Sequence, residues 1–200
     1  MQIIHNDSNL VTSTWGVGTV GQILQINEII NQSISFNSEI RLTFDISKNP
    51  SIVKLNPKKN IGIECLKILR LDNTAPFQAS NIYFRYAVNS WVNGVESENC
   101  TYSHIQARTS SNLHITKNFF HKGFEYGGGG RAYGVMLHLT TNECMVDNNI
   151  FKRLRHSMIL QAGANGNVFA YNYSIEPHRT ELINDFAGDM VLHGNYPFAN

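Results

Sequence analysis

The sequence predicts an all-β solenoid, a fold in which short strands and turns repeat along the chain. One apolar pattern occurs twice, because residues 145–151 (MVDNNIF) correspond to residues 168–174 (VFAYNYS), 23 positions later. Two strands and two turns fit into that length, and a repeat of roughly 20–50 residues is typical of solenoids. Asparagine, which favours tight turns and stacked amide rows, accounts for 24 of the 200 residues, and charged residues for only 16%.

The composition narrows the classes of function. A formal net charge of +1 gives no electrostatic reason to bind a nucleic acid or an anionic membrane, and no run of 18 apolar residues predicts a membrane span. Cys65, Cys100 and Cys144 have no paired spacing and are expected to be small apolar fillers. The start of the chain lacks the layout of a secretory signal, and its end, HGNYPFAN, stops part way into a repeat without a cap. The sequence therefore favours a piece of a longer, exported protein.

Two regions are expected along the chain. Residues 1–59 predict a loosely held lead-in over 1–14 and then a small antiparallel β element, with strands near 20–30, 33–37 and 39–46. Residues 60–200 predict the repeats themselves, which continue to the C-terminus.

Two families of short strands alternate through residues 60–200. The first comprises 61–68, 91–97, 113–119, 145–151 and 168–174, and the second 81–86, 102–107, 134–139, 157–162 and 189–194. When the strands of the second family are aligned, equivalent residues form columns that run from one repeat to the next. Two columns are apolar and are expected to point inward, and the column beside them is polar and is expected to point outward, because successive side chains of a strand alternate between its two faces. The inward columns are Ile82, Ser103, Val135, Met158 and Met190, and Phe84, Ile105, Leu137, Leu160 and Leu192. The polar column is Arg85, Gln106, His138, Gln161 and His193.

The first family carries a column of its own, formed by Asn118, Asn149 and Asn172. Amides stacked ~4.8 Å apart in neighbouring strands can hydrogen-bond in a row. Because buried polar groups need partners, such a row satisfies these side chains along the stack.

The links that lead from the first family to the second alternate in length. They are long at 69–80, 120–133 and 175–188 and short at 98–101 and 152–156. Long loops are therefore expected to rise from one edge, with low saddles between them. Loops on a rigid scaffold are where function is expected.

These motifs resemble the right-handed parallel β-helix proteins of the pectin-lyase-like superfamily, in particular bacterial β-helix repeat proteins. The resemblance is carried by the asparagine row in NNIF and YNYS, by YGVMLHL, by RHSMILQAGANGNVFAYNYS and by HGNYPFAN, and it covers about residues 60–200. It implies a right-handed parallel β-helix preceded by a small β element, and a polysaccharide as substrate or ligand. The superfamily includes pectate lyases, polygalacturonases, alginate epimerases, tailspikes and non-catalytic members, and the aspartate set of polygalacturonases has no match in this chain.

The polar column is the first candidate site. Outward groups at ~4.8 Å steps can follow an extended glycan. Arg85, Gln106 and Gln161 are the candidates for binding the substrate, and His138 and His193 for general acid or base catalysis near neutral pH. The alternative is an ordinary solvated face.

The rim of the long loop is the second candidate site. It contains His121, Glu125, four consecutive glycines (127–130), Arg131 and Tyr133, with Arg155 and His156 from the neighbouring saddle. Arg131 and His156 are candidate catalytic residues for removing a proton beside a uronate carboxylate, and Tyr133 and Arg155 are candidate substrate-binding residues. The glycines allow close backbone approach, as a lid or a tight wrap. The alternative is that these side chains only brace the loop.

A carboxylate pair for glycoside hydrolysis is the third candidate. Such a pair lies roughly 5–9.5 Å apart, and Asp189, with Glu125, Glu181 or Asp185, is the best placed acid. We expect no cofactor, because the eight histidines show no zinc-ligand spacing and no acidic cluster indicates calcium.

The sequence thus predicts a carbohydrate-active protein, a polysaccharide lyase or glycoside hydrolase acting on an extended glycan that can contain uronic acids. Such a protein would act outside the cell or at its surface. Under this hypothesis Arg131, His138, His156 and His193 share one cleft. The alternatives are a non-catalytic β-helix that binds glycan or belongs to a surface or tailspike assembly, and a scaffold whose active repeats lie beyond residue 200.

Overall fold

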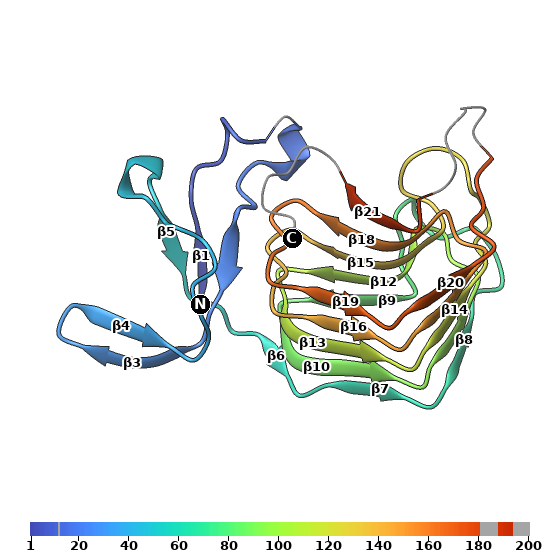
Figure 1. Ribbon diagram of the computed structural model, residues 1–200, viewed down its shortest axis with the longest axis horizontal. Helices are drawn as coiled ribbons and strands as arrows, with labels where there is room; N and C mark the ends of the chain where they lie inside the picture. The colour runs from blue at the N-terminus through green and yellow to red at the C-terminus, as the bar shows by residue number, and fades with distance from the viewer. Residues whose placement is uncertain (12, 181–187, 194–200) are drawn as a thin grey trace.

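The structure is a computed structural model that describes residues 1–11, 13–180 and 188–193 (Figure 1). Its N-terminal part contains two antiparallel sheets. The first has the strand order β2-β1-β5, and the second is the hairpin β3-β4. The bounds are β1 Gln2–Ile4, β2 Gly21–Ile23, β3 Ile26–Ile30, β4 Ser33–Phe36 and β5 Ser51–Val53, with short 3-10 helices η1 Thr14–Gly16 and η2 Ile46–Lys48.

Two predictions for this N-terminal part are wrong. Residues 1–14, expected to be a loosely held lead-in, contain β1, the central strand of its sheet. The buried Asp7 carboxylate fixes this segment, since it accepts hydrogen bonds from the Gly18, Thr19 and Val20 amides at 2.6, 3.0 and 2.9 Å. The strand expected over 39–46 does not form. There the Gln22 side chain takes the place of a strand partner, since it donates to the Glu39 carbonyl at 2.8 Å and accepts from the Arg41 amide at 2.9 Å.

The remainder of the described chain is built of three parallel sheets, which confirms the prediction of an all-β protein with parallel strands (Figure 1). Sheet 1 contains β6 Lys58–Lys59, β7 Gly62–Glu64, β10 Ala87–Asn93, β13 Ser111–Thr116, β16 Met145–Asp147 and β19 Val168–Ala170. Sheet 2 contains β8 Lys67–Leu69, β11 Glu96–Glu98, β14 Phe119–His121, β17 Ile150–Lys152 and β20 Tyr173–Ile175. Sheet 3 contains β9 Ile82–Arg85, β12 Ser103–Arg108, β15 Tyr133–His138, β18 His156–Gln161 and β21 Met190–His193.

The chain visits sheets 1, 2 and 3 in that order, repeatedly, and each strand pairs with the strands one repeat before and after it. The predicted correspondence of 145–151 with 168–174 is confirmed, since Met145 pairs with Val168 and Ile150 with Tyr173. The first strand family, however, divides between two sheets. The backbone turns between sheet 1 and sheet 2 at a residue with φ between 52° and 65° in every repeat: Cys65, Gly94, Lys117, Asn148 and Tyr171.

The asparagine row lies just after this corner, and the predicted hydrogen bonds are present. Asn118 Nδ2 donates to Asn149 Oδ1 at 2.9 Å, and Asn149 Nδ2 donates to Asn172 Oδ1 at 3.0 Å. Inside the sheets an apolar core surrounds the row, and in it the Phe120 and Phe151 rings lie 5.5 Å apart between centroids. The core and the amide row together hold successive repeats in register.

In sheet 3 the predicted register is wrong by two residues at one strand. The structure pairs Ile105 with Ile82 and with Val135, so Ile105, and not Ser103, belongs to the first inward column. Arg108, and not Gln106, pairs with Arg85 and His138 in the polar column. A shift by two residues keeps every side chain on its own face, so the apolar pattern alone does not reveal it.

The N-terminal sheet packs against the stack of parallel sheets through side-chain hydrogen bonds. Asn142 accepts from the Ile23 amide at 3.0 Å and donates to the Ile23 carbonyl at 3.1 Å, as a strand partner would. Asn165 Nδ2 donates to the Gly21 carbonyl at 2.8 Å. Strand β2 is therefore fixed to the corner between sheets 3 and 1. In the part of the chain that the structure describes, no helix is long and apolar enough to cross a membrane.

Candidate functional site

The segments that lead from sheet 2 to sheet 3 form one edge of the molecule, which we call the loop edge. In agreement with the sequence, they are long at 70–81, 122–132 and 176–189, and short at 99–102 and 153–155; residues 181–187 of the last long segment lie outside the described residues. Because the sheets are parallel, these segments lie beside one another in sequence order. The loop edge thus consists of projecting loops with saddles between them.

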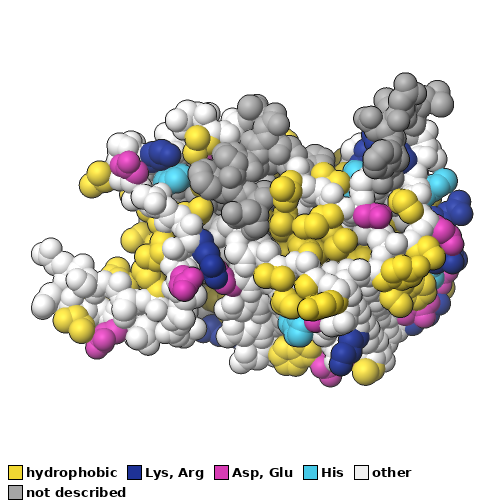
Figure 2. Space-filling model, in the orientation of Figure 1, with side chains coloured by type: hydrophobic (Ala, Val, Ile, Leu, Met, Phe, Trp, Pro, Cys, Tyr) yellow, Lys and Arg dark blue, Asp and Glu magenta, His cyan; other side chains and the backbone are white. Residues whose placement is uncertain are grey.

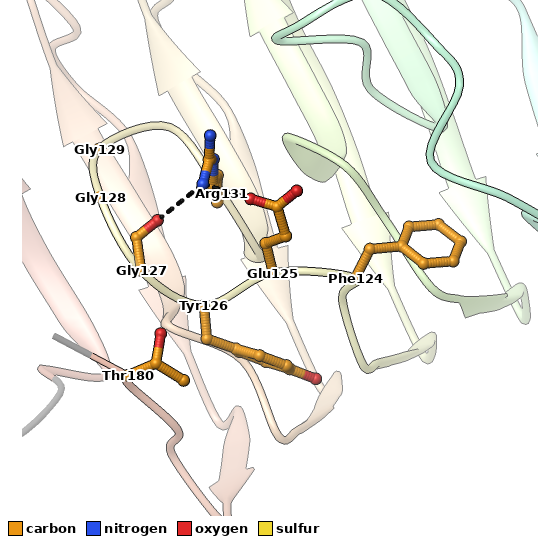
Figure 3. A pocket seen from close by; sticks show the side chains of 8 residues that line it. All are labelled: Phe124, Glu125, Tyr126, Gly127, Gly128, Gly129, Arg131 and Thr180. Carbon is orange, nitrogen blue, oxygen red and sulfur yellow. Dashed lines mark hydrogen bonds and ion pairs between the residues drawn. The ribbon is translucent and has the colours of Figure 1, made fainter.

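Two pockets lie on either side of loop 122–132. The first, the Asn73 pocket, has a volume of 170 Å³ and is lined by Asn73, Ala75, Phe77, Thr101, Glu125 and Arg131. The second, the Thr180 pocket, has a volume of 560 Å³ and is lined by Phe124, Glu125, Tyr126, Gly127, Gly128, Gly129, Arg131 and Thr180 (Figure 3). Glu125 and Arg131 line both pockets, so one ion pair separates them.

This ion pair connects the loops of the edge. The Arg131 guanidinium contacts the Glu125 carboxylate and donates to the Gly127 carbonyl at 3.4 Å (Figure 3). It also lies 5.8 Å from the centroid of the Phe77 ring. Asn73 Nδ2 donates to Glu125 Oε1 at 2.9 Å. These bonds use Arg131 Nη1, so the Nε and Nη2 hydrogens have no hydrogen-bond partner among the described residues and can bind a ligand.

Loop 122–132 is a tight wrap in this structure. Its amides at Gly123 and Gly130 donate to the phenol oxygens of Tyr126 and Tyr133 at 2.9 and 2.8 Å. Gly130 has φ +77°, and a Cβ there would meet the Phe77 and Tyr102 rings at 3.3 Å, so the close approach requires glycine.

Beneath this loop lie three of the predicted site residues, all of them buried. Arg155 Nη1 donates to Tyr133 Oη at 3.3 Å and to His156 Nε2 at 3.0 Å, and the Tyr133 and His156 rings lie 5.4 Å apart. His156 Nδ1 lies 2.8 Å from the Gly188 carbonyl, which can only accept, so Nδ1 carries the proton and Nε2 accepts. The predicted rim cluster of Tyr133, Arg155 and His156 is therefore brought together.

The polar column lies at the other end of sheet 3. His138 closes β15, about 17 Å along the strand from Tyr133 at ~3.3 Å per residue. The column was expected to face solvent, but His138 and Gln161 are 5% exposed, and Gln106 and Gln161 amide nitrogens lie 3.0 and 3.3 Å from the His138 ring nitrogens. His138 lines neither pocket of the loop edge, so the expectation that it shares one cleft with Arg131 is wrong.

Two further predicted residues, Arg85 and Asp189, line neither pocket. Arg85 closes β9, where its guanidinium lies 5.2 Å from the Tyr86 ring. Asp189 Oδ1 accepts a hydrogen bond from Ser174 Oγ at 2.9 Å. His193 pairs with Gln161 at the end of β21, and its side chain, like Glu181 and Asp185, lies outside the described residues. Glu125 is the one carboxylate among the described residues that line the two pockets, so these residues provide no acid pair there.

One cluster with metal-binding residue types lies on the outer face of sheet 2, where charged side chains gather at the right of Figure 2. It consists of Glu96, Glu98 and His121. Lys67 Nζ lies 2.9 Å from Glu96 and 2.8 Å from Glu98, and Lys122 Nζ lies 2.8 Å from Glu98. Hydrogen bonds from Lys122 and Lys67 lower the pKa of Glu98 to about 2. The ammonium groups already compensate these carboxylates, so the cluster is an ion-pair network of the surface.

The lining residues that the sequence did not single out include three on the first long loop and its saddle: Asn73, Phe77 and Thr101. These residues belong to no recognisable sequence motif. Their segments lie beside Glu125 and Arg131 because the preceding strands β8, β11 and β14 pair with one another in sheet 2. The structure is therefore that of an all-β protein with three parallel sheets, and its loop edge carries the two pockets. The chain matches no family model, no curated protein and no solved structure.

The buried histidines make stability depend on pH. Burial lowers the pKa of His104 and of His138 from 6.5 to about 3. The unfolded chain therefore binds protons that the folded protein does not bind as the pH falls from about 6.5 towards 3, and stability decreases over this window. Between pH 7 and pH 5 we expect a loss of about 2 kcal/mol for each of the two histidines.

Urea unfolding at pH 7 and at pH 5 measures this loss. His138→Gln removes one of the two groups, so its stability should change with pH by about 2 kcal/mol less than that of the wild type, whatever the variant costs at pH 7. An unchanged pH dependence in the variant would show that His138 does not titrate as a buried group.

Proposed function

We propose that the three parallel sheets form a right-handed parallel β-helix of the pectin-lyase-like type, and that the protein is carbohydrate-active, binding an extended polysaccharide across its loop edge. The β-helix is supported by the fixed order in which the chain visits the three sheets and by the asparagine row at one corner. The resemblance of residues 60–200 to this superfamily points the same way. A polysaccharide ligand places the protein outside the cell or at its surface.

The observation that carries the proposal is the pair of pockets on either side of loop 122–132. Both are lined by Glu125 and Arg131, so a ligand that fills one pocket reaches the groups that line the other. A single small molecule would occupy one pocket, whereas an extended polysaccharide can place successive sugars in both.

The lining has the chemistry that sugars require. Phe77, 61% exposed, and the half-buried Phe124 and Tyr126 offer apolar ring faces for the C–H faces of sugars. Hydrogen-bonding groups for hydroxyls come from Asn73, Thr101, Glu125, Arg131 and Thr180. Arg131 can also pair with a uronate carboxylate through its Nε and Nη2 groups, since a guanidinium binds a carboxylate with two parallel hydrogen bonds.

Catalysis is the second candidate function, and one observation favours it. Tyr133, Arg155 and His156 form a hydrogen-bonded cluster directly beneath the glycine loop. In a lyase reaction the base takes the proton beside the uronate carboxylate, a carbon–carbon double bond forms, and the bond to the leaving sugar oxygen breaks. That oxygen keeps the electron pair and is protonated by water or by a protein acid. Tyr133 and His156 are the two groups of this cluster that can hold such a proton.

Binding and turnover can be tested in one set of experiments. Calorimetric titration with uronate oligosaccharides and with neutral oligosaccharides of matched length measures binding, and ultraviolet absorbance and reducing-end assays on the same mixtures measure elimination and hydrolysis. We expect saturable binding that strengthens with chain length until both pockets are filled. If no oligosaccharide of either class binds, the proposal is wrong. If binding occurs without unsaturated products or new reducing ends, the protein binds glycan without catalysis.

A further inference from the structure

A second concave site lies away from the loop edge, between the N-terminal sheet and sheet 1. This junction cavity has a volume of 470 Å³. It lies where the chain passes from β5 to β6 beside the first residues of β10 and β13. Figure 1 shows the N-terminal sheet beside the parallel stack at this passage. Its position separates it from the pockets of the proposed polysaccharide site.

One wall of the junction cavity is held in place by buried hydrogen bonds. The Ile23 amide and carbonyl are bonded to the Asn142 side chain at 3.0 and 3.1 Å, and the next residue, Leu24, donates its amide to the Met1 carbonyl at 2.9 Å. The cavity is therefore preformed, as small-molecule sites usually are.

Half of the residues that line the cavity are apolar. Apart from Met1, the apolar residues of the lining are Ile23, Leu24, Ile26, Ile52, Leu55, Pro57 and Val88. Two of them leave apolar surface in water, since Ile52 is 60% exposed and Ile26 is 38% exposed. A ligand with an apolar body would cover this surface, at a gain of about 25 cal/mol for each Å² removed from water.

The charged side chains of the lining all have the same sign. They are Lys54 and Lys59, and no aspartate or glutamate of the described part of the chain lines the cavity. Within the described residues neither lysine takes part in an ion pair, whereas Lys67, Lys122 and Lys152 do. An anionic group at the cavity would therefore find two cations whose charge is not yet compensated.

We propose that the junction cavity binds an amphipathic anion, a carboxylate attached to an apolar chain or ring. The apolar part lies against Ile26, Ile52 and Val88, and the carboxylate lies beside Lys54 and Lys59. An apolar chain next to an anionic group is shared by free fatty acids and by anionic lipids in a membrane, and the volume of the cavity corresponds to one small molecule of the first kind.

Decanoate, used below its micelle concentration, is the probe that tests this site. Calorimetric titration should show one saturable site, and the neutral analogue decanol should bind about tenfold more weakly because it lacks the charge that two lysines attract. Raising the salt concentration should weaken decanoate binding and leave decanol unaffected.

Lys54→Gln and Lys59→Gln should each weaken decanoate binding roughly fivefold, the effect of one exposed ion pair. Lys58→Gln is the matched control, because Lys58 precedes Lys59 in the same strand but does not line the cavity, and decanoate should bind this variant as it binds the wild type. Circular dichroism shows whether each variant is folded.

Three results would overturn the proposal: no saturable decanoate binding, equal binding of decanoate and decanol, or an equal loss in all three lysine variants. Vesicles of anionic and of neutral phospholipid distinguish the two sources of the ligand. Sedimentation with anionic vesicles, but no binding of monomeric decanoate, would assign the lysines to a membrane surface and refute a ligand site. Because glycans do not enter these measurements, the outcome is independent of the proposed polysaccharide function.

Discussion

Replacing Asn149 by alanine is expected to lower the free energy of unfolding by about 4 kcal/mol, because it leaves several buried polar groups without partners. The Asn149 amide makes four hydrogen bonds: its Oδ1 accepts from the Asn118 amide and from Asn118 Nδ2, and its Nδ2 donates to the Ile115 carbonyl and to Asn172 Oδ1, at 2.9 to 3.0 Å. Two of the three partner residues are closed to water in the folded protein, since Asn118 is 2% and Ile115 0% exposed. Urea unfolding at pH 7 measures the loss.

Asn148 provides the matched control, because it is the neighbouring asparagine and is exposed. Its φ of +54° is tolerated by glycine, so Asn148→Gly should change the stability by less than about 1 kcal/mol. If Asn149→Ala is no more destabilising than Asn148→Gly, the asparagine row does not hold the repeats together.

Arg131→Gln is expected to weaken oligosaccharide binding by about 2 kcal/mol, or roughly thirtyfold in Kd, because hydrogen bonds from a charged donor are lost from both pockets at once. The Arg131 guanidinium is the one cationic group among the described residues that line the two pockets. The loss should be greatest for uronate oligosaccharides, since these have a carboxylate for the guanidinium to bind. Calorimetric titration of the variant and the wild type with the same oligosaccharides gives the ratio.

Arg153→Gln removes the same charge from the same edge and serves as the control. Arg153 lies on the saddle 153–155, with its guanidinium 6.0 Å from the Tyr126 ring, and lines neither pocket. Its substitution should change Kd by less than threefold, the effect of one exposed charge. Equal losses in both variants would mean that binding depends on the net charge of the edge and not on the pockets.

The sequence is sufficient to predict the parallel sheets because successive repeats carry the same side chains at the same places. Asn118, Asn149 and Asn172 fix the register of three repeats through one amide row, and the apolar residues around them repeat with the same spacing. The alternation of long and short links at the loop edge is equally visible, since it depends only on the number of residues between strands.

The errors arise where the structure depends on contacts that no local pattern records. The corner residues Lys117 and Tyr171 have positive φ, although neither residue type favours it, so a single strand was expected where two sheets meet. Strand β1 is held by Asp7 through amides 11 to 13 residues away, and Arg108 replaces Gln106 because the β12 register differs by two.

The candidate site was predictable only in part. Arg131, Tyr133, Arg155 and His156 lie at one edge because they flank a long loop and a saddle, which the sequence shows. The bond between Asn73 and Glu125 joins residues 52 positions apart, and nothing in either loop indicates its partner. Burial of His138 was equally invisible, because it depends on the side chains of the neighbouring repeats.

A crystal structure with a bound oligosaccharide tests the central proposal most directly, because it shows where the glycan lies. We expect continuous sugar density that crosses loop 122–132, with one sugar beside Asn73 and Phe77, another beside Tyr126 and Thr180, and Arg131 bonded to the chain between them. A glycan bound along the outer face of sheet 1 or 2, or in the junction cavity, with both pockets of the loop edge empty, would contradict the account.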